Sequence, residues 1–142
     1  MDPPPPADLS DRVRTFLEGQ LYPVLATSGP DGEPHQAVIW YRLDADDRIL
    51  VNSRSPRRWP AELRDRGRAS LAFTDLANPM SWVGVQAVVE EVIDDVARAR
   101  DDIVELAIRY DEADEASVAA FRSQERISFR LRITSVHDHT EE

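Results

Sequence analysis

The sequence predicts one mainly β domain (α+β), in which about six antiparallel strands curl into a small closed or partly split barrel with short flanking helices. Three observations support this. Gly, Pro and Asp turns separate β-prone segments in the first third of the chain, two later segments alternate apolar and polar residues with period two, and helical periodicity interrupts the strands twice. A length of 142 residues fits a single domain.

The N-terminal region predicts a tail followed by a short helix. Residues 1–8 contain four consecutive prolines, which favour a disordered or polyproline-like segment. Ser10 is a suitable N-cap, and Gly19 is a suitable stop for the helix between them. The apolar face of this helix, expected to pack on the sheet, consists of Val13, Phe16 and Leu17.

Three strands follow directly in sequence. They are expected at Tyr22 to Ser28, Pro34 to Leu43 and Arg48 to Ser53. The turn at residues 29–32 contains two glycines, a proline and an aspartate, which is typical of a β-hairpin, and residues 44–47 form a second reverse turn. The pattern predicts an antiparallel meander.

The second half of the chain alternates strands with helices. Strands are expected at Arg68 to Asp75, Ser81 to Val92 and Ile127 to Ile133. Between the last two strands, Val96 to Tyr110 carries an apolar stripe at helical spacing, and Glu115 to Arg122 is a second helical stretch. We therefore expect one domain over residues 9–137, a disordered C-terminal tail over 138–142, and helices inserted after the third and fifth strands.

Composition excludes several functional classes. The net charge is −10 and there is no cysteine, so thiolate metal sites, disulfides and a catalytic thiol are excluded, while nucleic acid and membrane insertion are not expected. The sequence contains no lysine, which excludes Schiff-base chemistry. His137 and His139 are candidate metal ligands by residue type. Because they lie near a chain end, we interpret them as solvated side chains and expect no metal. Without a signal peptide or transmembrane segment, we expect a cytoplasmic protein.

A cluster of arginines is the main functional signal. Residues 54–68 hold six arginines against two acidic residues, although the whole chain is strongly acidic. The helix predicted at Ser55 to Arg66 begins either at Pro56, with Ser55 as N-cap, or at Pro60. In both registers Arg57 and Arg58 lie at a helix N-terminus, where cations are disfavoured unless an anion binds between them. The alternative is that these arginines pair with the acidic region 94–115 or with a second subunit.

Aromatic residues accompany this cluster. Trp40, Tyr41, Trp59 and Trp82 could stack on a planar heteroaromatic ligand, and core packing or a dimer interface explains them equally well. No nucleophile motif, metal-spaced histidine pair or glycine-rich phosphate loop is present. An enzyme with so few acid–base groups needs a cofactor for its reaction.

The order of short motifs resembles a known superfamily. The carrying segments are Val24-Leu25-Ala26-Thr27, Pro30-Asp31-Gly32-Glu33-Pro34, Val38-Ile39-Trp40-Tyr41, Val51-Asn52-Ser53, Arg57-Arg58-Trp59-Pro60-Ala61-Glu62-Leu63, Arg68-Ala69-Ser70-Leu71 and Asn78-Pro79. From Phe16 to Val136 the chain is similar to the flavin and deazaflavin oxidoreductases of the pyridoxamine-5′-phosphate-oxidase-like superfamily, and most similar to its F420-dependent branch. Two positions depart from the pattern: some relatives have Lys at Trp59, and Asn is common at Glu62.

The resemblance implies a six-stranded antiparallel split β-barrel that forms a homodimer, with the cofactor in grooves between subunits. It implies that the phosphate and acidic tail of F420, or the phosphate of FMN, meet the region after the third strand, and that the ring lies along the second and third strands. The cofactor-binding residues that it implies are Gln36, Val38, Trp40, Asn52, Ser53, Ser55, Arg57, Arg58, Trp59, Met80, Ser81 and Trp82, where the last three could come from either subunit.

The resulting functional hypothesis is an F420-dependent oxidoreductase that transfers a hydride from reduced deazaflavin to an unsaturated organic acceptor. An FMN-dependent oxidase or reductase of the same fold is the alternative enzyme. A non-catalytic flavin- or F420-binding protein is the alternative from another class, because fold does not fix function.

Overall fold

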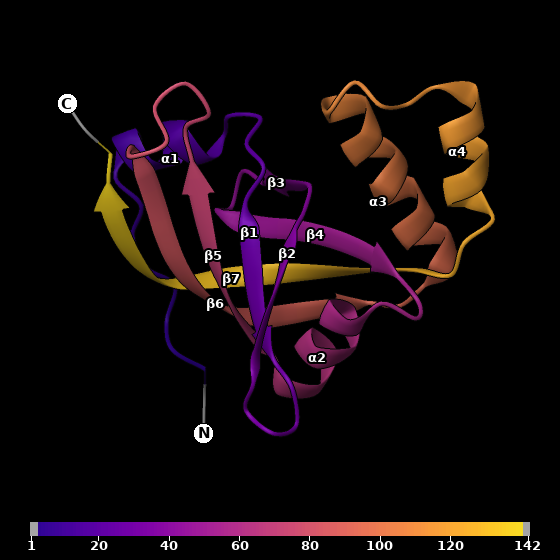
Figure 1. The fold of residues 1–142 in the computed structure, drawn as a ribbon, viewed down its shortest axis with the longest axis horizontal. Coiled ribbons are helices and arrows are strands. Elements are labelled where there is room, and N and C mark those ends of the chain that lie inside the picture. Colours follow the sequence, from indigo (N-terminus) through magenta and orange to yellow (C-terminus); the bar gives the residue numbers. More distant parts are fainter. Residues whose placement is uncertain (1–2, 141–142) are drawn as a thin grey trace.

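A computed structural model describes residues 3–140, and within them one antiparallel sheet has the strand order β2-β1-β5-β6-β7-β4-β3. The sheet curls into a half-barrel with helices at its margins (Figure 1). The elements are α1 (Asp11–Leu17), β1 (Val24–Ser28), β2 (Pro34–Val38), β3 (Tyr41–Leu43), β4 (Arg48–Arg54), α2 (Arg58–Arg66), β5 (Arg68–Thr74), β6 (Trp82–Ile93), α3 (Val96–Arg109), α4 (Glu115–Arg122) and β7 (Arg126–His139). The mainly β split-barrel class is confirmed.

The predicted second strand is divided, which corrects both the strand count and the meander. β2 pairs with β1, whereas β3 pairs with β4 at the opposite edge of the seven-stranded sheet. Between them the N–H of Ile39 donates to the carbonyl of Pro23 (3.1 Å). One sequence segment therefore runs from one edge of the sheet to the other. The strand is interrupted at Ile39 and Trp40, between β2 and β3, and this gap between the two edges is where the barrel is split.

Helix boundaries follow their caps. Ser10 accepts a hydrogen bond from the N–H of Val13 as predicted, and α1 ends at Leu17 with Glu18 as C-cap, so the predicted stop Gly19 directly follows the cap. α2 begins at Arg58 with Arg57 as N-cap, so neither predicted register is correct and Ser55 is not the cap. Pro60 is the third residue of α2, where its missing N–H would have no partner within the helix.

Two apolar layers hold the fold together. The barrel interior is filled by alternating strand residues such as Leu25, Leu71 and Phe129. On the outer face of β4, the buried Leu50 lies on the side of the strand away from that core, and α3 packs against β4 and β7 with its own buried stripe of Ala99, Ile103, Leu106 and Ala107. α3 and α4 thus cover one flank of the sheet, while α2 packs mainly against β1 and lies below β4 in the view (Figure 1).

The chain ends contact the strands at several points. The N–H of Ala7 donates to the carbonyl of Ile133 (2.8 Å), and Arg132 donates to the carbonyl of Pro4 (3.1 Å). β7 continues to His139, so two residues expected in the C-terminal tail belong to a strand. Residues 1–2 and 141–142, which belong to the two predicted tails, lie outside the described residues.

Candidate functional site

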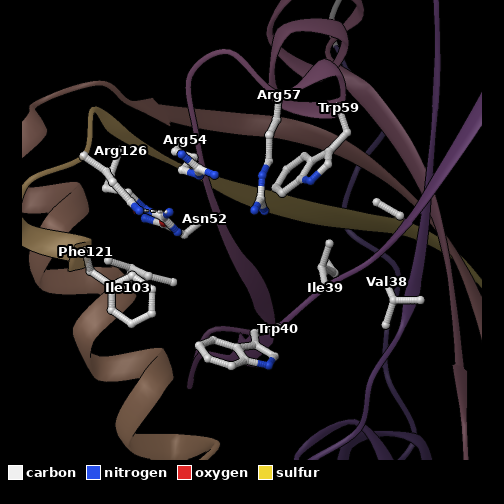
Figure 2. Close-up of a pocket in the computed structure, with 12 residues that line it drawn as sticks. Val38, Ile39, Trp40, Asn52, Arg54, Arg57, Trp59, Ile103, Phe121 and Arg126 are labelled. Atoms are coloured by element: carbon white, nitrogen blue, oxygen red, sulfur yellow. Dashed lines mark hydrogen bonds between the residues drawn. The ribbon is translucent and has the colours of Figure 1, made fainter. Parts of the chain in front are cut away.

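A cavity of about 560 Å³ opens where the second strand is broken. Its walls come from the β2–β3 junction, the end of β4, the start of α2, the α3–α4 pair and the start of β7 (Figure 2). The lining residues are Ala37, Val38, Ile39, Trp40, Asn52, Arg54, Arg57, Trp59, Ile103, Phe121, Gln124 and Arg126.

Three arginines meet at this cavity. The antiparallel register of β4 and β7 places Arg54 directly opposite Arg126, and Arg57 follows as the N-cap of α2. None of the three forms an ion pair with a carboxylate among residues 3–140. Burial, followed by the repulsion of Arg57 and Arg54, lowers the pKa of Arg126 to about 10. The cavity therefore carries an uncompensated positive charge.

Neutral partners hold Arg126 in place. Arg126 is only 6% exposed. Its Nε donates to Oδ1 of Asn52 (3.0 Å), and its Nη1 donates to Oε1 of Gln124 (2.8 Å). The guanidinium lies 5.6 Å from the ring centre of Phe121, within cation–π range. This arrangement fixes the guanidinium without neutralising it.

Asn52 connects the arginine to α3. Its amide nitrogen donates to the carbonyl of Ala99 (2.9 Å) and to Oγ of Ser128 (2.7 Å), and Ser128 in turn donates to Asp102 (2.8 Å). Burial raises the pKa of Asp102. Asn52 is therefore oriented on both sides, so that its Oδ1 points to Arg126.

Aromatic side chains lie among the arginines (Figure 2). Trp40 stacks on Tyr110, with ring centres 5.2 Å apart and planes 8° from parallel, and meets Phe121 edge-on at 6.4 Å. Trp59 lies beside Arg57 at the start of α2, is 8% exposed and lies 6.4 Å from Phe129. A cavity lined by both cations and aromatic rings suits a molecule with an anionic group and a planar apolar body.

Five of the predicted cofactor-binding residues line the cavity: Val38, Trp40, Asn52, Arg57 and Trp59. Ser55 lies beside it, where with Arg57 it lines an adjoining cavity of about 380 Å³. The remaining predicted residues line neither cavity.

Each of these remaining residues has a definite place. Arg58 is exposed at the first position of α2, and Gln36 is exposed on β2. Ser53 is fully buried on the same side of β4 as Val51, and its Oγ has no hydrogen-bond partner among residues 3–140. Met80 and Ser81 belong to the β5–β6 connection, and Trp82 is the first residue of β6, where it stacks on His137 at 5.1 Å.

Sequence reasoning missed several cavity residues. Arg54 was part of the arginine cluster but was not selected, whereas Arg126, Gln124, Phe121 and Ile103 lie about fifty residues or more further along the chain. Strand pairing brings Arg126 to the cluster, and the packing of α3 and α4 brings Ile103 and Phe121. No local pattern predicted either arrangement. The alternative of surface pairing holds for Arg64, which binds Asp94 (2.8 Å).

Two further classes of site were sought in residues 3–140. No three His, Asp or Glu side chains are grouped so that they could hold a metal ion. None of the described helices is long and apolar enough to cross a membrane.

The curled sheet and its cavity define a split-barrel protein with an arginine-lined cleft at the break between β2 and β3. The family model for pyridoxamine 5′-phosphate oxidase matches residues 9–139, and the chain belongs to this family.

Solved structures share this fold. An F420 reductase is 22% identical, with a TM-score of 0.75, over 91% of this chain and 98% of the other. A conserved hypothetical protein from Mycobacterium tuberculosis is 22% identical, with a TM-score of 0.69, over 94% and 87%. General stress protein 26 from Bacillus anthracis is 12% identical, with a TM-score of 0.65, over 92% and 94%. No curated protein sequence matches the chain.

Proposed function

We propose that the protein is an F420-dependent oxidoreductase that transfers a hydride from reduced deazaflavin to an unsaturated organic acceptor. The observation that carries the proposal is the set of unpaired arginines beside Trp40 and Trp59 in one cavity of a pyridoxamine-5′-phosphate-oxidase fold. The similarity to an F420 reductase favours the deazaflavin over FMN, which is the alternative cofactor.

The residues present fit a cofactor with a phosphate and a planar ring. Arg57 caps α2 without a side-chain capping bond, and free N–H groups of the first turn of the helix are available to an anion. Val38, Trp40 and Trp59 offer apolar and aromatic surface to a ring. When bound, reduced F420 supplies the hydride; the chain's own residues hold the anionic end, orient the ring and exclude water from it.

We propose that the active form is a homodimer. Register across four strands aligns Val38, Val24, Ala72 and Gly84 on the outer face of the sheet. Val38 and Val24 are 67% and 40% exposed, and the loop preceding β6 adds Met80 at 68%. A row of apolar and small side chains on a sheet face favours a second copy as its cover.

The dimer is tested by light scattering at micromolar concentration. A stable pair is expected to bury more than about 1,200 Å² in total. A charge in the middle of the row, Ala72→Asp, should yield monomers, whereas Gln86→Asp further along the same face serves as the control. A wild-type monomer would contradict the dimer proposal.

The cofactor is tested by titrating the purified full chain separately with F420 and with FMN, following tryptophan fluorescence. We expect saturable quenching by F420, and a smaller quenching amplitude in Trp40→Phe because that residue lines the cavity. Saturable binding of FMN but not of F420 would show that FMN is the cofactor. Binding of neither would refute the proposed function.

Catalysis is tested separately from binding. Oxidation of reduced F420 is followed by absorbance with a panel of enones, enals and unsaturated carboxylic acids. Acceptor-dependent oxidation supports the oxidoreductase. Tight binding without oxidation by any acceptor supports the non-catalytic binding protein instead.

A further inference from the structure

The β4–β7 ladder contains two cross-strand arginine pairs with different surroundings. Arg48 lies opposite Arg132 at one end of the ladder, and Arg54 lies opposite Arg126 at the other. Like charges directly opposite each other destabilise a sheet, so each pair needs a counter-charge. Glu90 supplies it to the first pair, at 2.9 Å from Nε of Arg48 and 2.8 Å from Nε of Arg132.

The second pair has no carboxylate from the described residues. Arg126 is more than nine-tenths buried, and its hydrogen bonds go to the neutral side chains of Asn52 and Gln124. Nη2 and one hydrogen of Nη1 have no acceptor among residues 3–140. A guanidinium in this state can still give two parallel hydrogen bonds to a carboxylate. A buried cation without a partner is costly, so the site favours an anion from outside the chain.

Burial separates this anion from the anionic end of the cofactor. The cavity holds three arginines that differ in how deeply they are buried. Arg57, exposed at the start of α2, and Arg54, half-buried at the end of β4, are placed for the solvated phosphate. Arg126 is the deepest of the three, against Phe121 and near Ile103, where a smaller group attached to an apolar body fits better.

From these observations we infer that Arg126, held by Asn52 and Gln124, is the receptor for a carboxylate on the acceptor, whose apolar body lies against Phe121 and Ile103. The acceptor class is therefore an unsaturated carboxylic acid rather than a neutral enone. This inference rests on the proposed function, because it takes the other arginines to be occupied by a cofactor.

The test compares two probes that differ in charge and not in shape: trans-cinnamate and trans-cinnamamide. Their affinities for the full chain are measured by calorimetric titration, with and without the cofactor identified above. We expect cinnamate to bind about tenfold more tightly or better, because only its carboxylate can accept charge-assisted hydrogen bonds from Arg126. Saturating cofactor should change the cinnamate affinity by less than about threefold, since the two occupy different arginines.

Two variants identify the receptor. Arg126→Gln removes the cation, and Gln124→Glu supplies an internal counter-charge at the atom that already accepts from Nη1. Both should abolish the preference for cinnamate and weaken cofactor binding much less, because Arg54 and Arg57 remain in place. Because Gln124→Glu is isosteric and adds an attractive contact, it keeps the test decisive if Arg126→Gln fails to fold.

Three outcomes would overturn the inference: equal or undetectable binding of both probes by the wild-type chain, a preference that survives Gln124→Glu, or displacement of cinnamate by the cofactor. The last would assign Arg126 to the cofactor. Failure of the proposed function has a different signature, because absence of cofactor binding leaves the comparison of cinnamate with cinnamamide unaffected.

Discussion

Each end of the β4–β7 ladder holds a pair of facing arginines, but only one of the two pairs has an acidic partner among the described residues. At the Arg48 end, Glu90 bridges the facing arginines on the outer surface. At the Arg54 end, α2, α3 and α4 surround the facing arginines, and no acidic side chain among the described residues reaches them. The first end shows what a stability-optimised arginine pair looks like in this chain. The second end departs from it in a protein with ample acidic residues, which is typical of a binding site.

We call the end with Arg48 and Arg132 the paired end, and the end with Arg54 and Arg126 the unpaired end. The largest effect is expected on ligand affinity at the unpaired end. Arg57→Ala should weaken cofactor binding about ten- to a hundredfold, since charge-assisted hydrogen bonds contribute about 1.5–3 kcal/mol. Its melting temperature should hardly change, because Arg57 makes no side-chain capping bond. Fluorescence titration and thermal melts measure the two quantities.

Arg58→Ala is the matched comparison for Arg57→Ala. Arg58 is the next residue, equally charged and exposed, but it does not line the cavity, so the structure favours a smaller loss there. Equal losses would place both arginines on the anion. Unchanged affinity for both F420 and FMN in the double variant would refute the anion assignment.

A carboxylate added at the unpaired end should make it resemble the paired end. Gln124→Glu in the ligand-free protein is expected to raise the free energy of unfolding by about 1–2 kcal/mol, because it neutralises a buried guanidinium that it already contacts. Urea unfolding measures this difference. A destabilised variant would show that Arg126 is already compensated, and the contrast between the two ends would disappear.

Removal of the bridging carboxylate should make the paired end resemble the unpaired one. Glu90→Gln is expected to cost about 1 kcal/mol, since Glu90 is partly exposed and serves two surface pairs. Cofactor affinity should be unchanged, because Glu90 does not line the cavity. A change in affinity would mean that the two ends of the ladder are coupled.

The stabilisation contributed by Glu90 should depend on pH. Hydrogen bonds from Arg48 and then Arg132 hold the pKa of Glu90 below its usual value in the folded chain. The carboxylate therefore stabilises the fold above the unfolded-state pKa of about 4.3, and this contribution is lost as pH falls through the lower folded-state pKa. Wild type and Glu90→Gln should differ in stability at pH 6 and converge towards pH 3. A constant difference would refute the electrostatic explanation.

The smallest effect is expected from the N-terminal tail, whose described hydrogen bonds lie near the end of the ladder that holds Arg48 and Arg132. Deletion of residues 1–8 removes the bond from Ala7 to Ile133 and the contact of Arg132 with Pro4, at a cost of about 1 kcal/mol or less. The melting temperature should fall by a few degrees at most, with cofactor affinity unchanged. A larger loss would show that the tail is an integral part of the sheet.

The sequence by itself determined the local elements. Alternation and turn residues located most strand ends to within two residues, although β7 runs six residues beyond its predicted end and the second predicted strand is divided. The N-cap Ser10 was correct, and the insertions after the third and fifth predicted strands were found. These features depend on neighbours in sequence, because strand alternation and helix capping act over a few residues. The arginine cluster was also readable, and Arg57 proved to line the cavity.

Only the tertiary structure decided which distant residues complete the site. The break at Ile39 and Trp40 arises because one segment must serve both edges of the sheet, and no local pattern marks it. Arg126 reaches the cluster through the register of β4 with β7, which is set by the packing of the whole sheet. Whether a given arginine is neutralised or left free therefore depends on strand pairing and not on its neighbours in sequence.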